Sequence, residues 1–110
     1  MTLLAKRQER SIVPRMYYIT TAIDYTNGPP HIGHAYEKVL ADVLARWHRM
    51  KGEEVYFLTG VDQHGQKVQQ TAEKLGITPQ EHVNNITEQF LALWNRLGIS
   101  NDGWASTTDP

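Results

Sequence analysis

Two short segments of the chain contain residue types that could bind or activate a substrate. The first contains two histidines with a glycine between them. His31 and His34 flank Gly33 within residues 27–34, just before a stretch with helical spacing. The free N–H groups at a helix N-terminus attract phosphate, and imidazoles can donate hydrogen bonds to phosphate oxygens. Gly33 has no side chain, so a planar base or a phosphate can approach the backbone there. The segment predicts a nucleotide site suited to phosphoryl or nucleotidyl transfer, in which positioning and charge stabilisation do most of the work.

Asp62 and His64 mark a second polar segment, residues 59–65, which follows a run rich in β-branched and aromatic residues. Open parallel sheets bind ligands at the carboxyl ends of their strands, so we expect both segments to face one crevice. Asp62 could pair with an ammonium group that His64 helps to orient. A turn followed by a helix cap is the alternative interpretation of these two residues. His31, His34 and His64 do not predict a metal site, because neither a helical His-x-x-x-His pair nor a nearby acidic set accompanies them.

Two strands joined by a helix must position these segments. Residues 17–22 and 54–60 are rich in aromatic and β-branched types and are expected to form buried strands. Between them, apolar residues recur at steps of three and four, which predicts a helix of about 18 residues closed by residues 51–52. The apolar positions of this helix are Tyr36, Val39, Leu40, Val43, Leu44, Trp47 and Met50. A strand, a helix and a second strand form a right-handed βαβ unit with parallel strands.

Two further helices are predicted after the second strand. Residues 66–75 form a helix that stops at Gly76. Thr78 caps the next helix, with Pro79 at its first position and Glu81 completing a capping box. Its apolar stripe is Val83, Ile86, Phe90, Leu93, Trp94 and Leu97. The predicted fold class is therefore α/β: the N-terminal half of a Rossmann-like nucleotide-binding domain, with parallel strands in a βαβ unit followed by two helices.

The ends of the chain differ from its body. Residues 1–15 carry four basic residues and one acidic residue, so they form a basic tail, either an arm for an anionic partner or a solvated stretch. Residues 100–110 are polar and are expected to be turn-like, without a closing element. Two parallel strands are too few for a stable sheet. We therefore expect residues 16–110 to be the truncated N-terminal segment of a larger domain, or to pair their exposed edges with another chain.

Composition excludes several classes of protein. The chain has 110 residues, 40% of them hydrophobic and 21% charged, which fits one globular domain and argues against disorder. It has no cysteine, so it is neither a disulfide-stapled secreted domain nor a zinc finger, and the cytoplasm is its expected location. No apolar run approaches the roughly 18 residues of a membrane helix. Residues 16–110 carry a net charge of −4. They therefore lack the basic surface of a domain that holds nucleic acid unaided.

Several runs together resemble the start of methionyl-tRNA synthetases, which are class I aminoacyl-tRNA synthetases, over roughly residues 16–110. The runs are residues 22–34, 41–42, 46, 50–52 and 59–65. His-Ile-Gly-His at residues 31–34 resembles the signature of the class, and alone it leaves the leucine, isoleucine, valine, cysteine and other synthetases open. Asp-x-His-Gly at residues 62–65, after a Thr-Gly strand end, points to methionine.

The resemblance implies a reaction in two steps. Methionine's carboxylate attacks the α-phosphate of ATP, which enters as its magnesium complex, and methionyl-adenylate and pyrophosphate form. The methionyl group then moves to the 3′ end of tRNA. By this resemblance His31 and His34 hold the ATP phosphates and stabilise the developing charge, and Gly33 lets adenine lie against the backbone.

The same resemblance implies an amino-acid pocket. Ala22, Ile23 and Tyr25 would flank the methionine side chain, because a flexible thioether suits an apolar and aromatic wall. Asp62 would receive the α-ammonium group, with His64 beside it.

The chain also departs from the family. Asp24 stands where the family usually has proline or tyrosine, which leaves its role open. The Lys-Met-Ser-Lys-Ser loop, the zinc-binding insertion and the anticodon-binding domain of such enzymes lie beyond the matching residues. The isolated chain is therefore expected to be inactive, to lack zinc ligands, and to self-associate through strand edges and the apolar faces of two helices. Alternatives are another class I synthetase, a small nucleotidyltransferase, or a non-catalytic remnant that pairs with another protein.

Overall fold

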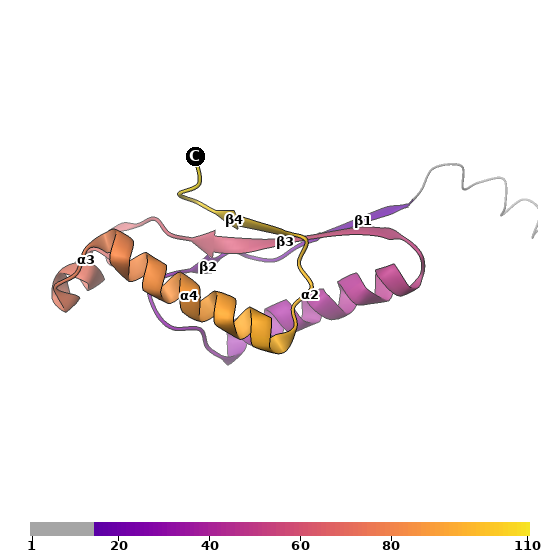
Figure 1. Cartoon of the computed structure of the whole chain (residues 1–110), viewed down its shortest axis with the longest axis horizontal. Coiled ribbons are helices and arrows are strands. Elements are labelled where there is room, and N and C mark those ends of the chain that lie inside the picture. The colour runs from indigo at the N-terminus through magenta and orange to yellow at the C-terminus, as the bar shows by residue number, and fades with distance from the viewer. Residues whose placement is uncertain (1–14) are drawn as a thin grey trace, which may run out of the picture.

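The computed structural model describes residues 15–110, which form a parallel sheet with helices packed on it (Figure 1). Its strands are β1 (Met16–Thr20), β2 (Asp24–Tyr25), β3 (Glu54–Asp62) and β4 (Gly103–Ser106). Every other strand pairs with β3 in parallel. The carbonyl of Asp62 accepts a hydrogen bond from Thr26 N–H, and that of Val61 accepts one from Thr107 N–H. Because successive carbonyls of a strand point to opposite sides, β2 and β4 flank β3 on opposite edges, and β3 is the central strand.

The predicted βαβ unit is confirmed. Helix α2 (Ile32–Met50) connects β1 and β2 to β3. Lys51 is its C-cap residue, and Gly52, whose φ is 78°, follows. The register places Thr20 opposite Leu58 in the parallel pair of β1 and β3. The parallel half-unit of a nucleotide-binding sheet is therefore present.

Helices α3 (Gln66–Leu75) and α4 (Pro79–Leu97) also match the prediction. The left-handed conformation of Gly76, with φ 70°, ends α3, and Gly98, with φ 66°, ends α4. Thr78 Oγ1 accepts a hydrogen bond from Glu81 N–H at 3.1 Å. Within residues 15–110 only this half of the predicted capping box is formed.

The helices cover one face of the sheet, with α2 and α4 side by side (Figure 1). Helix α4 buries most of its predicted apolar stripe, because Val83, Ile86, Phe90 and Trp94 are all buried. The last three form a core cluster against which Ile99 and Trp104 pack. A second cluster joins α2 to the sheet through Ala41, Ala45 and Phe57.

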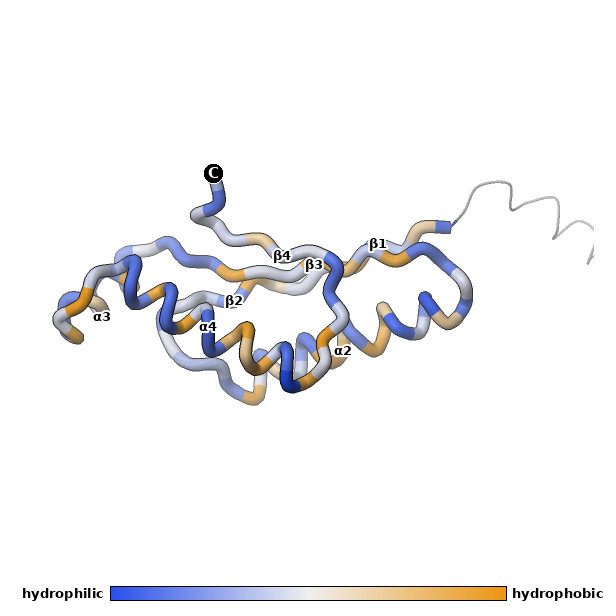
Figure 2. Tube along the Cα trace, in the orientation of Figure 1, coloured by the Kyte–Doolittle hydropathy of each residue, from blue (hydrophilic) through white to orange (hydrophobic). Residues whose placement is uncertain are grey.

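Helix α2 lies on the sheet with its small and charged residues rather than its large apolar ones. Its buried residues are Lys38, Ala41, Asp42 and Ala45. Its exposed apolar stripe consists of Tyr36, Val39, Leu40, Val43, Leu44, Trp47 and Met50. Hydrophobic positions recur along the α2 tube in Figure 2. The alanines allow the helix axis to approach the strands closely, and they leave the large apolar side chains without cover among the described residues.

Residues 17–22 were predicted to be a buried strand, and this is wrong in two respects. β1 ends at Thr20, and its side chains alternate between exposed and half-buried. The helices cover one face only, so Met16 and Tyr18, on the other face, remain exposed. β3 likewise buries its second half rather than its first, and it runs two residues further than predicted, to Asp62.

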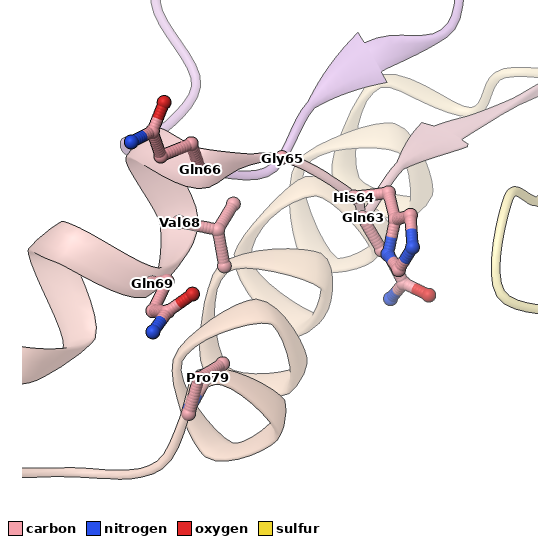
Figure 3. Close-up of a pocket in the computed structure, with 7 residues that line it drawn as sticks. All are labelled: Gln63, His64, Gly65, Gln66, Val68, Gln69 and Pro79. Atoms are coloured by element: carbon pink, nitrogen blue, oxygen red, sulfur yellow. The ribbon is translucent and has the colours of Figure 1, made fainter.

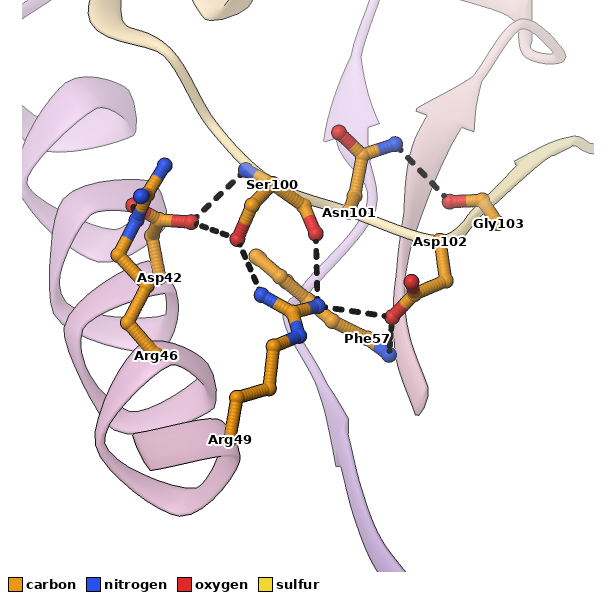
Figure 4. Close-up of polar contacts among 8 residues, drawn as sticks. All are labelled: Asp42, Arg46, Arg49, Phe57, Ser100, Asn101, Asp102 and Gly103. Carbon is orange, nitrogen blue, oxygen red and sulfur yellow. Dashed lines mark hydrogen bonds and ion pairs between the residues drawn. The ribbon is translucent and has the colours of Figure 1, made fainter. Parts of the chain in front are cut away.

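Residues 100–110 were predicted to be turn-like, but they contain strand β4. Asp42 Oδ1 accepts hydrogen bonds from Ser100 N–H at 2.7 Å and from its hydroxyl at 2.5 Å. Asp102 Oδ2 accepts from Phe57 N–H at 2.8 Å and from Arg49 Nη2 at 3.0 Å (Figure 4). These contacts with α2 and β3 direct the polar segment into the sheet although its own residues have weak strand propensity.

The predicted basic tail, residues 1–15, lies outside the described residues except for Arg15. Among residues 15–110 no helix has both the length and the apolar character needed to cross a membrane.

Candidate active site

The two-histidine turn, residues 31–34, forms the first turn of α2 and caps it. His31 is the N-cap residue, and its Nδ1 accepts a hydrogen bond from Gly33 N–H at 3.0 Å. His34 Nδ1 accepts from His31 N–H, also at 3.0 Å. The two imidazoles therefore make a reciprocal capping box, a task that Ser or Thr with Glu more often performs.

This arrangement determines which ring nitrogens remain for a ligand. A neutral imidazole has one acceptor nitrogen and one N–H donor. Because both Nδ1 atoms accept backbone N–H groups, the neutral rings carry their proton on Nε2. The ring centroids of the two histidines lie 3.9 Å apart, and those of His34 and Phe90 lie 5.0 Å apart in a T-shaped arrangement. Two N–H donors thus stand at the positive end of a helix dipole.

Burial lowers the pKa of His34, and the neighbouring charges of His31 and Lys38 lower it further. Asp24 acts in the opposite direction but does not outweigh the burial. His34 is therefore neutral at neutral pH, in the form that the capping bond requires.

Gly33 is needed for a reason that the sequence did not reveal. A Cβ atom at this position would lie 2.8 Å from Cε1 of His31. A side chain at residue 33 would therefore press on the His31 ring, which would have to shift from its place beside the Gly33 N–H group.

β2 and the end of β3 bring together two of the residues predicted to bind the amino acid, Tyr25 and Asp62. The parallel register places Tyr25 opposite Asp62. The Tyr25 hydroxyl would lie 2.5 Å from a Cβ atom at Gly65, so the ring reaches the loop that follows β3. Gly65 has φ 149°, a conformation that favours glycine. Tyr25 therefore lies against the segment that carries Asp62 and His64.

Asp62 is half-buried and has a structural task. Its Oδ1 accepts hydrogen bonds from His64 N–H and from the Thr107 hydroxyl, both at 3.1 Å. This is the turn that the alternative interpretation predicts. Its Oδ2 receives no hydrogen bond from the residues that the structure describes, so one carboxylate oxygen remains for a ligand.

Ala22, Ile23 and His64 are exposed. A hollow of about 400 Å³ adjoins His64 between the loop after β3 and the starts of α3 and α4 (Figure 3). Its lining is Gln63, His64, Gly65, Gln66, Val68, Gln69 and Pro79. Of the predicted site residues, only His64 lines this hollow.

Two buried polar residues beside the site, Lys38 and His82, were not predicted from the sequence. Lys38 is fully buried and pairs with Asp24, whose role the sequence left open. His82 of α4 is buried, and its Nε2 lies 3.3 Å from Asn27 Oδ1. The signal for Lys38 is its place three residues before Ala41, on the face of α2 that approaches the sheet. Residues 15–110 contain no group of three or more His, Asp or Glu side chains arranged to hold a metal ion.

Comparisons with known proteins relate the chain to one family. The family model described as tRNA synthetases class I (M) matches residues 17–110. The methionine–tRNA ligase of Deinococcus radiodurans is 53% identical over 95 residues, which are 86% of this chain and 14% of that protein. The enzyme of the same name from Rhizobium meliloti is 54% identical over 93 residues, which are 84% of this chain and 18% of that protein.

A solved structure is similar in fold as well as in sequence. It is Mycobacterium tuberculosis methionyl-tRNA synthetase in complex with methionyl-adenylate, with a TM-score of 0.84 and 42% identity. The match covers 86% of this chain and 19% of that one. The chain thus spans less than a fifth of the length of these relatives. Since the family model covers nearly all the residues that the structure describes, the chain belongs to the class I tRNA synthetases of type M.

Proposed function

We propose that the chain is the N-terminal segment of the catalytic domain of a methionine–tRNA ligase. The observation that carries this proposal is the pair of capping histidines at the start of α2, in a chain about half identical to enzymes of that name. The full-length protein activates methionine with ATP and transfers the methionyl group to tRNA in the cytoplasm.

His31, Gly33 and His34 form the ATP half of the site. The Nε2–H groups of the two rings donate hydrogen bonds to phosphate oxygens, and their Nδ1 atoms keep the rings in place. The N-terminus of α2 adds the partial positive charge of its free N–H groups. As charge builds up on the α-phosphate and the leaving pyrophosphate, these preorganised donors stabilise it.

Ala22, Ile23, Tyr25, Asp62 and His64 form the amino-acid half. The exposed side chains of the first two and the Tyr25 ring offer an apolar and aromatic wall to a thioether. The Oδ2 atom of Asp62 accepts the α-ammonium group, while its Oδ1 keeps the turn. His64, which adjoins the hollow of Figure 3, lies beside that group.

In the first step a carboxylate oxygen of methionine attacks the α-phosphorus of ATP. The bond from that phosphorus to the bridging oxygen of pyrophosphate breaks, and methionyl-adenylate forms. In the second step the terminal ribose hydroxyl of tRNA attacks the methionyl carbonyl, and AMP leaves. Magnesium enters with ATP as part of the substrate. The residues of this chain act by orientation and charge, and they form no covalent bond to substrate.

The isolated chain lacks most of the length of its relatives, so we propose that it does not catalyse alone. The exposed apolar stripe of α2 would then have no partner in its own chain, which favours self-association of the isolated chain.

The test is pyrophosphate exchange into ATP, measured with single amino acids. The full-length protein should exchange pyrophosphate into ATP when methionine is present. With leucine, isoleucine or valine instead, the exchange should be at least a hundredfold slower. Exchange with one of those three instead would assign the chain to another class I synthetase. No exchange with any amino acid would refute the ligase proposal.

A further inference from the structure

Lys38 and Asp24 form a buried ion pair beside the candidate site. The Lys38 side chain is 0% exposed and Asp24 is 5% exposed. Lys38 Nζ lies 3.1 Å from Asp24 Oδ1 and 3.0 Å from Oδ2. Asp24 belongs to β2, and Lys38 lies in the second turn of α2, so the pair joins the two elements on which the site is built.

The ammonium group of Lys38 has three N–H donors, and each finds an acceptor. Besides Asp24, they are the carbonyl oxygen of Ala22 at 3.3 Å and Glu37 Oε1 at 2.9 Å. The Nζ atom also lies 5.2 Å from the ring centroid of Trp94, which belongs to α4. One buried cation therefore holds residues 22–24, α2 and α4 in a single arrangement.

Each member of the ion pair lies close in sequence to one half of the candidate site: Asp24 to the amino-acid half, and Lys38 to the ATP half. Ile23 and Tyr25 adjoin Asp24 in sequence, and Ala22 lies two residues before it; these three residues form the proposed methionine wall. His34 lies one helical turn before Lys38, and the charges of Asp24 and Lys38 act on its pKa in opposite directions. Any shift between residues 22–25 and the first turn of α2 would therefore separate the wall from the two-histidine turn.

We propose that Lys38 is a positioning residue: through Asp24 and the Ala22 carbonyl it holds the methionine wall at a fixed place relative to the two-histidine turn. This inference rests on the proposed function for what the wall binds, but the arrangement itself does not. A buried ion pair often adds little net stability compared with apolar residues of similar size. We therefore expect the ion pair to affect the placement of the wall more than the stability of the fold.

The first experiment uses the full-length protein and pyrophosphate exchange. Lys38→Met keeps the length of the side chain and leaves Asp24 without its partner. We expect kcat/KM for methionine to fall at least tenfold, mainly through KM, with the KM for ATP changed less than threefold. Lys51→Met is the matched control, because Lys51 lies at the far end of the same helix and is 43% exposed. It should leave all constants within twofold.

A second variant keeps the proposal testable when Lys38→Met folds poorly. Asp24→Asn with Lys38→Gln removes both charges and retains a hydrogen-bonding pair of similar size. It should recover at least half of the loss in kcat/KM, on a logarithmic scale, relative to Asp24→Asn alone. A purely structural role predicts a different result: lower melting temperatures, with an unchanged KM for methionine in the folded fraction. That result, or an equal rise in both KM values, would overturn the proposal.

Hydrogen exchange measured by mass spectrometry separates this inference from the proposed function. Lys38→Met should increase exchange in peptides covering residues 21–26 and 31–38 together, and Lys51→Met in neither. If the unsubstituted protein has no methionine-dependent exchange of pyrophosphate, the ligase proposal fails while this readout still decides the positioning role. Faster hydrogen exchange confined to residues 31–38 would contradict that role.

Discussion

Each imidazole of the two-histidine turn has two nitrogens with separate tasks. Nδ1 of His34 accepts the backbone N–H of His31, and Nε2 remains as a donor. The capping bond fixes the ring and its tautomer, so under the proposed function the donor needs no reorganisation to bind phosphate. The helix cap therefore depends on Nδ1 and the proposed phosphate contact on Nε2, so substitutions of His34 can remove one without the other.

Two substitutions of His34 test this division. In Asn the side-chain oxygen can take the place of Nδ1, whereas in Gln the amide nitrogen can take the place of Nε2. We expect His34→Asn to keep the cap, and the melting temperature, while exchange by the full-length protein falls roughly 100- to 1,000-fold, as for loss of one preorganised donor. His34→Gln should retain more activity but lose about 0.5–2 kcal/mol of stability with the cap. Equal activity in the two variants would contradict the division.

At this scale the sequence predicted local features and missed a long-range one. The turn, its glycine and the strand-end position of Asp62 could be predicted because they depend on neighbouring residues. The Asp24–Lys38 pair could not, since its residues are 14 apart and meet only when α2 presents Lys38 to the sheet. A buried lysine beside an exposed apolar stripe is the reverse of the usual helix pattern.

At the scale of elements, the junction between α2 and the segment leading to β4 holds the sheet to the helix. Burial alone would raise the pKa of Asp42, but hydrogen bonds from Ser100 and Arg46 outweigh it and hold that pKa below its ordinary value. Arg46 Nε lies 2.7 Å from Asp42 Oδ2, and Figure 4 shows Asp42 meeting Ser100. This carboxylate thus anchors the approach to a strand that sequence propensity did not predict.

The Asp42 anchor makes stability depend on pH. Its pKa is lower in the folded chain than in the unfolded chain, so the unfolded state binds more protons between the two values. The contribution is fully present above the unfolded-state pKa and is lost as pH falls through the folded-state pKa. We expect Asp42→Asn to lower the free energy of unfolding by about 1–3 kcal/mol at neutral pH. The difference should shrink below about pH 4.

Chemical denaturation of the chain and of Asp42→Asn across the acidic range measures this effect. Glu88→Gln serves as the control, because Glu88 is an exposed acid on α4. A difference between Asp42→Asn and the unsubstituted chain that stays constant with pH would show that the carboxylate is not the titrating anchor.

The burial of whole elements was harder to predict than their existence. Helices α2, α3 and α4 follow from periodicity and caps, which are written in consecutive residues. Which face of α2 is buried depends on how closely the strands approach, and Ala41 and Ala45 decide that. β4 depends on the contacts of Ser100 and Asp102 with elements more than 40 residues earlier.

At the scale of the molecule, helices cover one face of the sheet and α2 leaves its apolar stripe exposed. We expect the isolated chain to self-associate at high micromolar concentration, because such a stripe is an association surface. Val43→Glu, in the middle of the stripe, should lower the weight-average mass measured by sedimentation. Glu88→Gln should not change it. A monomer at every concentration would contradict this expectation.

The central claim is that two loops at one end of the sheet divide the substrates, with ATP at the start of α2 and methionine at the end of β3. The most direct test compares Asp62→Asn with the unsubstituted full-length protein in methionine-dependent exchange. The substitution leaves the ammonium group of bound methionine without its partner. Loss of one partner of a buried charge pair typically costs about 2–5 kcal/mol, so kcat/KM for methionine should fall at least tenfold. The KM for ATP should change far less, because the proposed contacts to ATP come from His31 and His34. Thr107→Val, which removes a donor to Oδ1 but keeps the carboxylate, should have little effect. An equal loss for both substrates, or for neither, would show that Asp62 only caps its turn.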